Sequence, residues 1–232
     1  RGWREDKGEA PLKENLAAAL LKLADWTPDT PLQDTFCGSG TIAIEAAQIA
    51  CNMAPGLKRH FLFENFADFD KELWQEIRDA PAPANRSAKV TIAASDISSI
   101  VVEKARENAR KAGLGALLDD GRLTFKQCDA RKAEPATAAG LLISNPPYGE
   151  QSNPKSASVA AMMKDVADNL KHHFAGWTAW LLTSDRLLPR QMRLSASRKV
   201  PLMNGPLECR FFKFDLVAGS MKRTPKAQPV AQ

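Results

Sequence analysis

The sequence predicts a doubly wound α/β fold, and three patterns lead to this prediction. A short apolar stretch at residues 32–36 runs into a glycine-containing loop at 37–41, and an alanine-rich helical pattern follows at 42–50. Strand, glycine loop and helix in this order form the first unit of such a fold. Further apolar stretches then alternate with helix-patterned segments, which is typical of parallel strands joined by crossover helices.

The predicted sheet is mostly parallel, has seven strands and carries helices on both faces. Its strands are expected at 32–36, 90–95, 123–128, 140–144, 177–183, 200–203 and 210–216. Asn204-Gly205-Pro206 joins the last two, so they should form a closing antiparallel hairpin. Helical patterns cover 12–23, 42–50, 100–112 and 158–174, and a short helix follows Asp185.

We expect three parts along the chain. Residues 1–30 are an arm and a helix that lead into the main domain at 31–217, and 218–232 form a basic, disordered tail. Within the main domain, 51–89 is an insertion after the first helix. We expect it to pack its own aromatic side chains, which are Phe61, Phe63, Phe66, Phe69 and Trp74. A substrate-facing lid that carries Lys58, Arg59 and His60 is the alternative.

The composition narrows the class of protein. The 232 residues carry a formal net charge of +5, which favours an anionic partner. The four cysteines form no Cys-x-x-Cys pair and the three histidines lack ligand spacing, so we expect no metal site and a reducing, cytoplasmic location. No apolar run approaches the roughly 18 residues of a membrane span.

The stretch Asn145-Pro146-Pro147-Tyr148 ends the apolar strand at 140–144. Two prolines stop a strand and leave a stiff, extended loop. The Asn145 side-chain oxygen and the Pro146 carbonyl are candidate acceptors, and Tyr148 offers a flat face beside them. This combination suits an –NH₂ group on a planar ring, whose two N–H bonds need two acceptors as charge develops on nitrogen. A proline-rich turn with a packed tyrosine is the alternative.

Four polar signals each follow a predicted strand: the glycine loop, Asp96, Asp129 and Asn145. Ligands of open α/β sheets bind outside the carboxyl ends of the strands. A carboxylate suits the glycine loop and the helix start, a ribose diol suits Asp96, and an adenine amino group suits Asp129. A dinucleotide meets only the first two demands, and its acidic residue should follow the loop by about 20 residues. S-adenosylmethionine meets all four, with its sulfonium methyl beside Asn145.

The chain resembles the class I, S-adenosylmethionine-dependent methyltransferases of the Asn-Pro-Pro-Tyr type. More narrowly, it is similar to bacterial 23S ribosomal RNA guanine-N2 methyltransferases that carry an upstream THUMP domain. The resemblance rests on RGWR, APLKE, DTFCGSGTIAIEAA, NMAPGL, SDI, CDA, NPPYGE, TSD and NGPLEC, which span nearly the whole chain. It implies a Rossmann-like methyltransferase fold, ribosomal RNA as partner, and a catalytic part separated from its THUMP domain, with no metal and no membrane.

The resemblance also implies roles for individual residues. The cofactor, released as S-adenosylhomocysteine, would contact Cys37, Gly38, Ser39, Gly40, Thr41, Asp96, Ile97, Asp129, Ala130 and Asn145. The catalytic residues would be Asn145, Pro146 and Tyr148. The substrate would contact Pro147, Tyr148, Gly149 and Glu150.

Two positions depart from the family pattern. Thr35 stands where the family usually has proline, which predicts a less rigid loop, and Gln151 replaces a frequent arginine that would contact phosphate. An adenine-N6 nucleic-acid methyltransferase and a protein glutamine methyltransferase stay open, because both act on a planar –NH₂ group. A non-catalytic RNA-binding module is the alternative outside enzymes.

Overall fold

The computed structural model describes residues 12–56, 59–79, 90–148 and 156–218. The predictions for the arm at 1–10, the tail from 219, Lys58, Gly149, Glu150 and Gln151 therefore lie outside the described residues.

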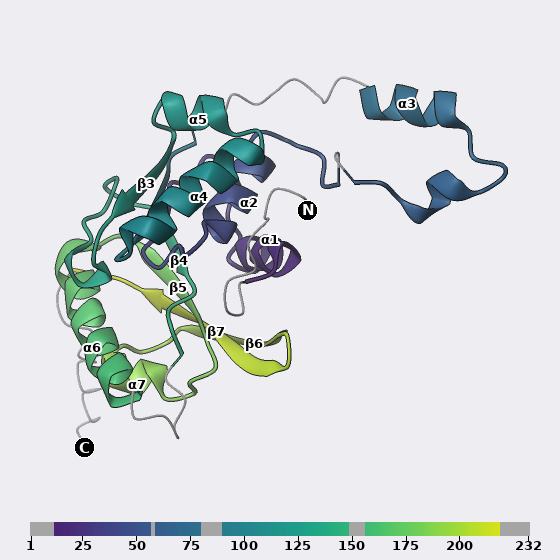
Figure 1. The fold of residues 1–232 in the computed structure, drawn as a ribbon. Helices are drawn as coiled ribbons and strands as arrows, with labels where there is room; N and C mark the ends of the chain where they lie inside the picture. The colour runs from purple at the N-terminus through teal and green to yellow at the C-terminus, as the bar shows by residue number, and fades with distance from the viewer. Residues whose placement is uncertain (1–11, 57–58, 80–89, 149–155, 219–232) are drawn as a thin grey trace, which may run out of the picture.

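A single seven-stranded sheet organises the described chain, with the strand order β3-β2-β1-β4-β5-β7-β6 (Figure 1). Its strands are β1 Leu32–Asp34, β2 Ile92–Asp96, β3 Leu123–Gln127, β4 Leu141–Ser144, β5 Thr178–Thr183, β6 Arg198–Asn204 and β7 Leu207–Asp215. The first five pair in parallel, while β7 runs antiparallel to β5 and to β6. The predicted fold class, including the closing hairpin, is confirmed.

Helices cover both faces of the sheet, as predicted (Figure 1). The α-helices are α1 Glu14–Leu23, α2 Thr41–Ala50, α3 Lys71–Asp79, α4 Ser99–Lys111, α5 Gly115–Asp119, α6 Ser156–His173 and α7 Leu188–Met192, with 3₁₀ turns η1 Leu62–Asn65 and η2 Ala130–Lys132. Alternate residues of the central strands enter two separate cores. In β5, Trp180 packs with the layer of α1, α2 and α4, whereas Ala179 and Leu181 pack with α6 and α7. This alternation is the period-two pattern of a strand buried on both faces.

Local chemistry sets several element boundaries. Ser98 caps α4 by accepting a hydrogen bond from the Val101 N–H, and Gly113 follows the helix with a φ of +86°. β1 is shorter than predicted because the chain turns after Asp34, whose side chain accepts a hydrogen bond from the Phe36 N–H at 3.1 Å.

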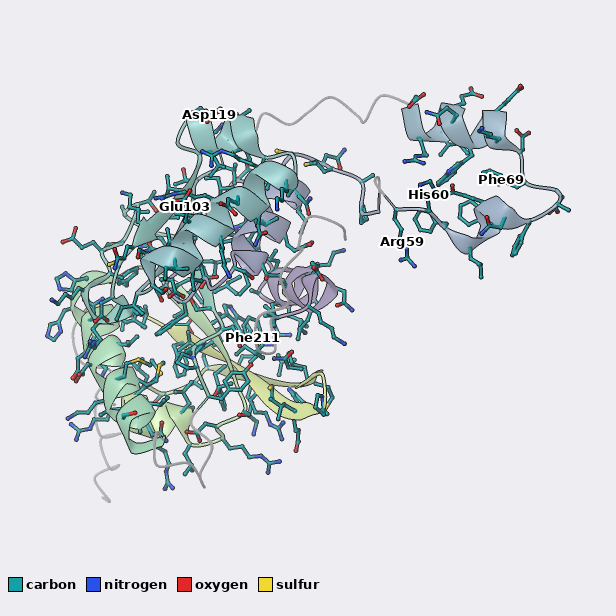
Figure 2. The ribbon with its side chains drawn as sticks, viewed as in Figure 1. Arg59, His60, Phe69, Glu103, Asp119 and Phe211 are labelled. Atoms are coloured by element: carbon teal, nitrogen blue, oxygen red, sulfur yellow. The ribbon has the colours of Figure 1, made fainter. Side chains whose placement is uncertain are left out.

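The described part of the insertion forms an arm that projects from the sheet domain and includes η1 and α3 (Figures 1 and 2). Its aromatic side chains pack on one another: the Trp74 ring stands edge-on to Phe61 at 5.9 Å and to Phe63 at 5.0 Å, and Phe63 contacts Phe69 at 5.8 Å. The predicted aromatic packing is thus confirmed for these four residues. Phe66 is the exception, because 59% of it is exposed.

Two basic residues of the insertion also have partners within its described part. The Arg59 guanidinium lies over the Phe61 ring at 5.2 Å, and His60 Nδ1 lies 3.2 Å from a Glu64 carboxylate oxygen (Figure 2). The lid interpretation of these residues stays a prediction.

Candidate active site

The carboxyl ends of four neighbouring strands bring the predicted site residues to one edge of the sheet. β3, β2, β1 and β4 are parallel neighbours, so the segments that follow them emerge on the same side. Asp96 ends β2, Asp129 lies two residues after β3, and Asn145 directly follows β4. The glycine loop follows β1, in the middle of this group.

The glycine loop needs both of its glycines, for different reasons. Gly38 has a φ of +52°, and a side chain there would meet no atom within 4 Å. Gly40 has a φ of +88°, and an added Cβ would lie 3.1 Å from both the Ala105 Cβ and the Phe125 ring. Gly40 therefore allows the start of α2 to pack closely against Ala105 of α4 and Phe125 of β3. Gly38 leaves open space above the backbone that a ligand could use.

Asp96 holds the loop in place while keeping capacity for a ligand. Its Oδ2 accepts a hydrogen bond from the Gly38 N–H at 3.1 Å, and its Oδ1 accepts one from the Ser98 N–H at 3.1 Å. An ionised carboxylate offers about four lone-pair sites, so both oxygens can still accept from hydroxyl groups. Ile97, which follows it, is 63% exposed and offers an apolar surface next to this carboxylate.

Asp129 is engaged by a neighbouring arginine, which the sequence did not reveal. The Arg131 Nε lies 3.0 Å from each carboxylate oxygen of Asp129, and the Arg131 backbone N–H donates to Oδ1 at 2.9 Å. These hydrogen bonds lower the pKa of Asp129 and raise the pKa of Arg131. An adenine amino group at Asp129 would therefore share the carboxylate with Arg131. Ala130 is buried, and its carbonyl accepts a hydrogen bond from Asn169 at 3.3 Å.

A buried polar network joins β1 to β4 directly beneath the glycine loop. The Ser144 hydroxyl donates to Asp34 Oδ1 at 2.8 Å and accepts from the Thr35 N–H at 2.9 Å. A proline at position 35 would lack this N–H, so threonine supplies a tie to β4 that the usual family residue cannot make. This hydrogen bond restrains the loop in place of a proline ring, and the lower rigidity of the loop stays a prediction.

Asp34 is the main residue of this network that sequence reasoning missed. It is 1% exposed, and its Oδ2 has no hydrogen-bond partner in the described part of the chain. Burial raises its pKa from 3.8 to about 7, although the bonds from Ser144 and the Phe36 N–H oppose the shift. Its place at the end of β1 was the available signal, because the other polar residues of the site also lie at or just after the ends of strands.

The loop after β4 places Asn145 and Tyr148 in direct contact. The Tyr148 hydroxyl donates a hydrogen bond to Asn145 Oδ1 at 2.6 Å, and the half-buried ring packs against the core on the α1, α2 and α4 side. Pro146 is buried and Pro147 is exposed. The hydroxyl also receives a hydrogen bond from Asn204 of the closing hairpin at 3.3 Å, a contact that the sequence did not suggest.

A domain model described as RMKL-like methyltransferase domain (UPF0020) matches residues 1–213. The chain belongs to this family. Its fold and the glycine loop after β1 agree with that membership.

Curated relatives of this methyltransferase domain are considerably longer. Ribosomal RNA large subunit methyltransferase K/L of Shewanella sp. (strain ANA-3) is 42% identical over 238 residues, which cover 99% of this chain and 32% of the relative. YpsC of Bacillus subtilis (strain 168), named as an RNA methyltransferase, is 40% identical over 229 residues, which cover 98% of this chain and 58% of the relative. The chain thus spans about a third of the first and less than two thirds of the second.

Solved structures share the methyltransferase fold. SMU.472, described as a methyltransferase complexed with SAH, matches with a TM-score of 0.83 and 34% identity over 94% of this chain and 56% of its own. A Listeria monocytogenes protein, described as a predicted N6-adenine-specific DNA methylase, matches with a TM-score of 0.81 and 33% identity over 93% and 54%. The Listeria monocytogenes description names DNA as the substrate, and the SMU.472 description names none.

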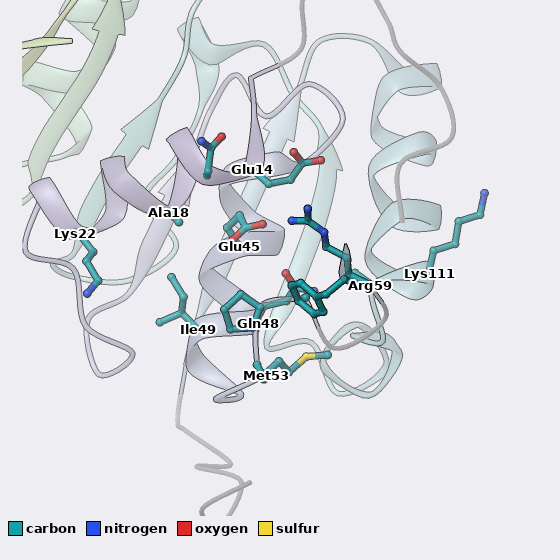
Figure 3. A pocket seen from close by; sticks show the side chains of 15 residues that line it. Glu14, Ala18, Lys22, Glu45, Gln48, Ile49, Met53, Arg59 and Lys111 are labelled. Carbon is teal, nitrogen blue, oxygen red and sulfur yellow. The ribbon is translucent and has the colours of Figure 1, made fainter. Parts of the chain in front are cut away.

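An apolar hollow of the methyltransferase domain lies away from the predicted site. A cavity of about 520 Å³ is lined by α1, the second half of α2 and the start of the insertion, including Ala18, Ile49 and Met53 (Figure 3). None of the described residues that line it belongs to the predicted site. Among the described residues, no group of three His, Cys, Asp or Glu could hold a metal, and no helix is long and apolar enough to cross a bilayer.

Proposed function

We propose that this domain transfers a methyl group from S-adenosylmethionine to the exocyclic N2 amine of a guanine in 23S ribosomal RNA. The observation that carries the proposal is the position of Asn145 and Pro146. They follow β4, next to the β1 strand whose glycine loop is our candidate for holding the cofactor. Acceptors for an amine and a ligand-binding loop therefore share one edge of the sheet.

The residues of this edge fit the cofactor in chemical type. Gly38 has open space above it, Asp96 keeps acceptor capacity for a diol, and Ile97 is exposed for contact with a flat ring. The N-terminus of α2 adds a partial positive charge suited to a carboxylate. When bound, the cofactor supplies an electrophilic methyl group.

The Asn-Pro-Pro-Tyr loop after β4 supplies hydrogen-bond acceptors for the amine and needs no general base. An exocyclic amine is a weak nucleophile because its lone pair is delocalised into the ring. Asn145 Oδ1 and the Pro146 carbonyl would accept its two N–H bonds and stabilise the positive charge that develops on nitrogen. The Tyr148 ring would cover the base, which must leave its stack to enter the site. The surplus proton leaves the methylated nitrogen for solvent.

RNA is favoured as the substrate by the names of the curated relatives and by the basic balance of the chain. Because those relatives are much longer, we further propose that an upstream THUMP domain contributes to RNA binding in the full-length protein. The N2 position and the 23S molecule are inferred from the resemblance of nearly the whole chain to 23S ribosomal RNA guanine-N2 methyltransferases, because the Asn-Pro-Pro-Tyr loop alone does not separate guanine from adenine.

Adenine-N6 methylation of DNA is the second candidate. It is favoured by the description of the Listeria monocytogenes structure, which is 33% identical to this chain. The two candidates share the amine chemistry and differ in the base and the nucleic acid.

Tritium-methyl transfer tests both candidates. Deproteinised ribosomal RNA, DNA and protein are offered with labelled S-adenosylmethionine, and the labelled product is digested and identified. We expect N2-methylguanosine from RNA, which Asn145→Ala should abolish and Asn15→Ala, on the exposed side of α1, should leave intact. N6-methyladenine from DNA would replace the first proposal with the second, and label in protein alone would overturn both.

A further inference from the structure

A directional chain of hydrogen bonds runs from the closing hairpin into the candidate active site. Asn204 Nδ2, at the end of β6, donates to the Tyr148 hydroxyl at 3.3 Å, and that hydroxyl donates to Asn145 Oδ1 at 2.6 Å. The Cys209 thiol of β7 also points at the hydroxyl, at 3.9 Å. The β6–β7 hairpin thus reaches a residue 56 positions before Asn204 in the chain.

The donors at the Tyr148 hydroxyl fix the direction of this series of hydrogen bonds. A tyrosine hydroxyl has a single hydrogen and two acceptor lone pairs. Asn204 and Cys209 both present hydrogens to its oxygen, so the hydroxyl hydrogen is left to point at Asn145. The short 2.6 Å distance between Tyr148 Oη and Asn145 Oδ1 agrees with this direction. A tyrosine hydroxyl keeps its hydrogen at neutral pH, and burial raises the pKa of Tyr148 further above its usual value.

The consequence for Asn145 is a fixed orientation of its amide. An asparagine side chain carries an acceptor and a donor at nearly equivalent positions, and only its hydrogen bonds decide which faces which way. A donor at Tyr148 selects the orientation with Oδ1 towards it. The carbonyl oxygen keeps a second lone pair, so one N–H of a target amine can bind there. In the flipped amide, Nδ2 would meet that amine donor to donor.

We propose that Asn204 is a positioning residue for methyl transfer, which acts through Tyr148 to orient the Asn145 amide as an acceptor. The inference rests on the proposed function of Asn145. It assigns the Tyr148 hydroxyl a role distinct from that of its ring: the ring covers the base, and the hydroxyl orients the acceptor. Cys209 is the weaker contributor, because a thiol is a poor donor and lies 3.9 Å away.

Three variants separate this role from a structural one. Tyr148→Phe keeps the ring and removes the hydroxyl, so RNA affinity should hold while the single-turnover rate falls about 2- to 13-fold, the range of one neutral hydrogen bond. Asn204→Ala removes the donor and should lower the rate within the same range. Asn204→Asp should lower it further, because its carboxylate would take the hydroxyl hydrogen away from Asn145. Met203→Ala, next in the strand and 56% exposed, is the matched control.

The readouts are the single-turnover rate at saturating RNA, the dissociation constants for cofactor and RNA, and the melting temperature. The inference requires the order wild type, Asn204→Ala, Asn204→Asp for the rate, with both dissociation constants and the melting temperature little changed. Equal rates for the two Asn204 variants, or a parallel loss of melting temperature and cofactor affinity, would overturn it.

Asn145→Ala, measured in the same series, separates the inference from the proposed function. If Asn145→Ala lowers the single-turnover rate while Tyr148→Phe and Asn204→Asp leave it unchanged, the positioning role of Asn204 is wrong and the amine-holding role of Asn145 stands. If Asn145→Ala keeps the rate, both are wrong.

Discussion

Replacing Asp34 by asparagine should make the stability of the domain much less dependent on pH. In the folded protein Asp34, the last residue of β1, is 1% exposed and accepts a hydrogen bond from Ser144 of β4, and its Oδ2 has no hydrogen-bond partner in the part of the chain that the structure describes. Burial disfavours the charged form most strongly, and the neighbouring Asp96 adds repulsion. An asparagine at this position would keep the Oδ1 acceptor for Ser144 and Phe36, so Asp34→Asn mimics the protonated carboxyl group.

The magnitude follows from the pKa. Folding raises the pKa of Asp34 from 3.8 to about 7, so between these values the folded state holds a proton that the unfolded state has lost. The free energy of unfolding then falls as the pH rises through this window, and the loss is complete above pH 7. Three pKa units correspond to about 4 kcal/mol at roughly 1.4 kcal/mol per unit.

Urea unfolding of both proteins at intervals from pH 4 to pH 8 measures this difference. We expect Asp34→Asn to match the wild type near pH 4 and to exceed it by up to about 4 kcal/mol at pH 8. Asp29→Asn, in an exposed turn, controls for the loss of one negative charge. A stability difference between Asp34→Asn and wild type that stays constant across the range would refute the reasoning.

Three further predictions concern the cofactor loop and RNA. Asp96→Ala should weaken S-adenosylmethionine binding by about 1.5–3 kcal/mol in calorimetry, and unchanged affinity in a folded variant would remove Asp96 from the site. Gly40→Ala should destabilise the domain by about 1–3 kcal/mol in thermal unfolding, because it combines a positive φ with close contacts, whereas Gly115→Ala, with nothing within 4 Å, should not. RNA affinity should fall steeply with salt, and it should rise when the proposed upstream THUMP domain is joined to the chain. Equal RNA affinity with and without that domain would contradict its proposed role.

The sequence by itself determined the strands of the sheet and most of the helices in order, because their signals are local, whereas α3 and α5 were not predicted. The Ser98 cap and Gly113 set the two ends of α4 through contacts within a few residues. Asn204-Gly205-Pro206 predicted the hairpin in the same way. Polar residues that directly follow apolar strands also indicated one binding edge, since parallel strands share the direction of their carboxyl ends. The roles of the individual site residues stay predictions.

Only the tertiary structure decided which of these polar groups touch. Local patterns carry no information on the strand order that sets β4 beside β1, and so they could not reveal the Ser144 bridge to Asp34 and Thr35. The contact of Asn204 with Tyr148 likewise joins residues 56 positions apart. Such contacts depend on packing between layers, where burial strengthens each hydrogen bond and makes each missing partner costly. For that reason the pKa of Asp34 and the orientation of Asn145 follow from the fold rather than from their sequence neighbours.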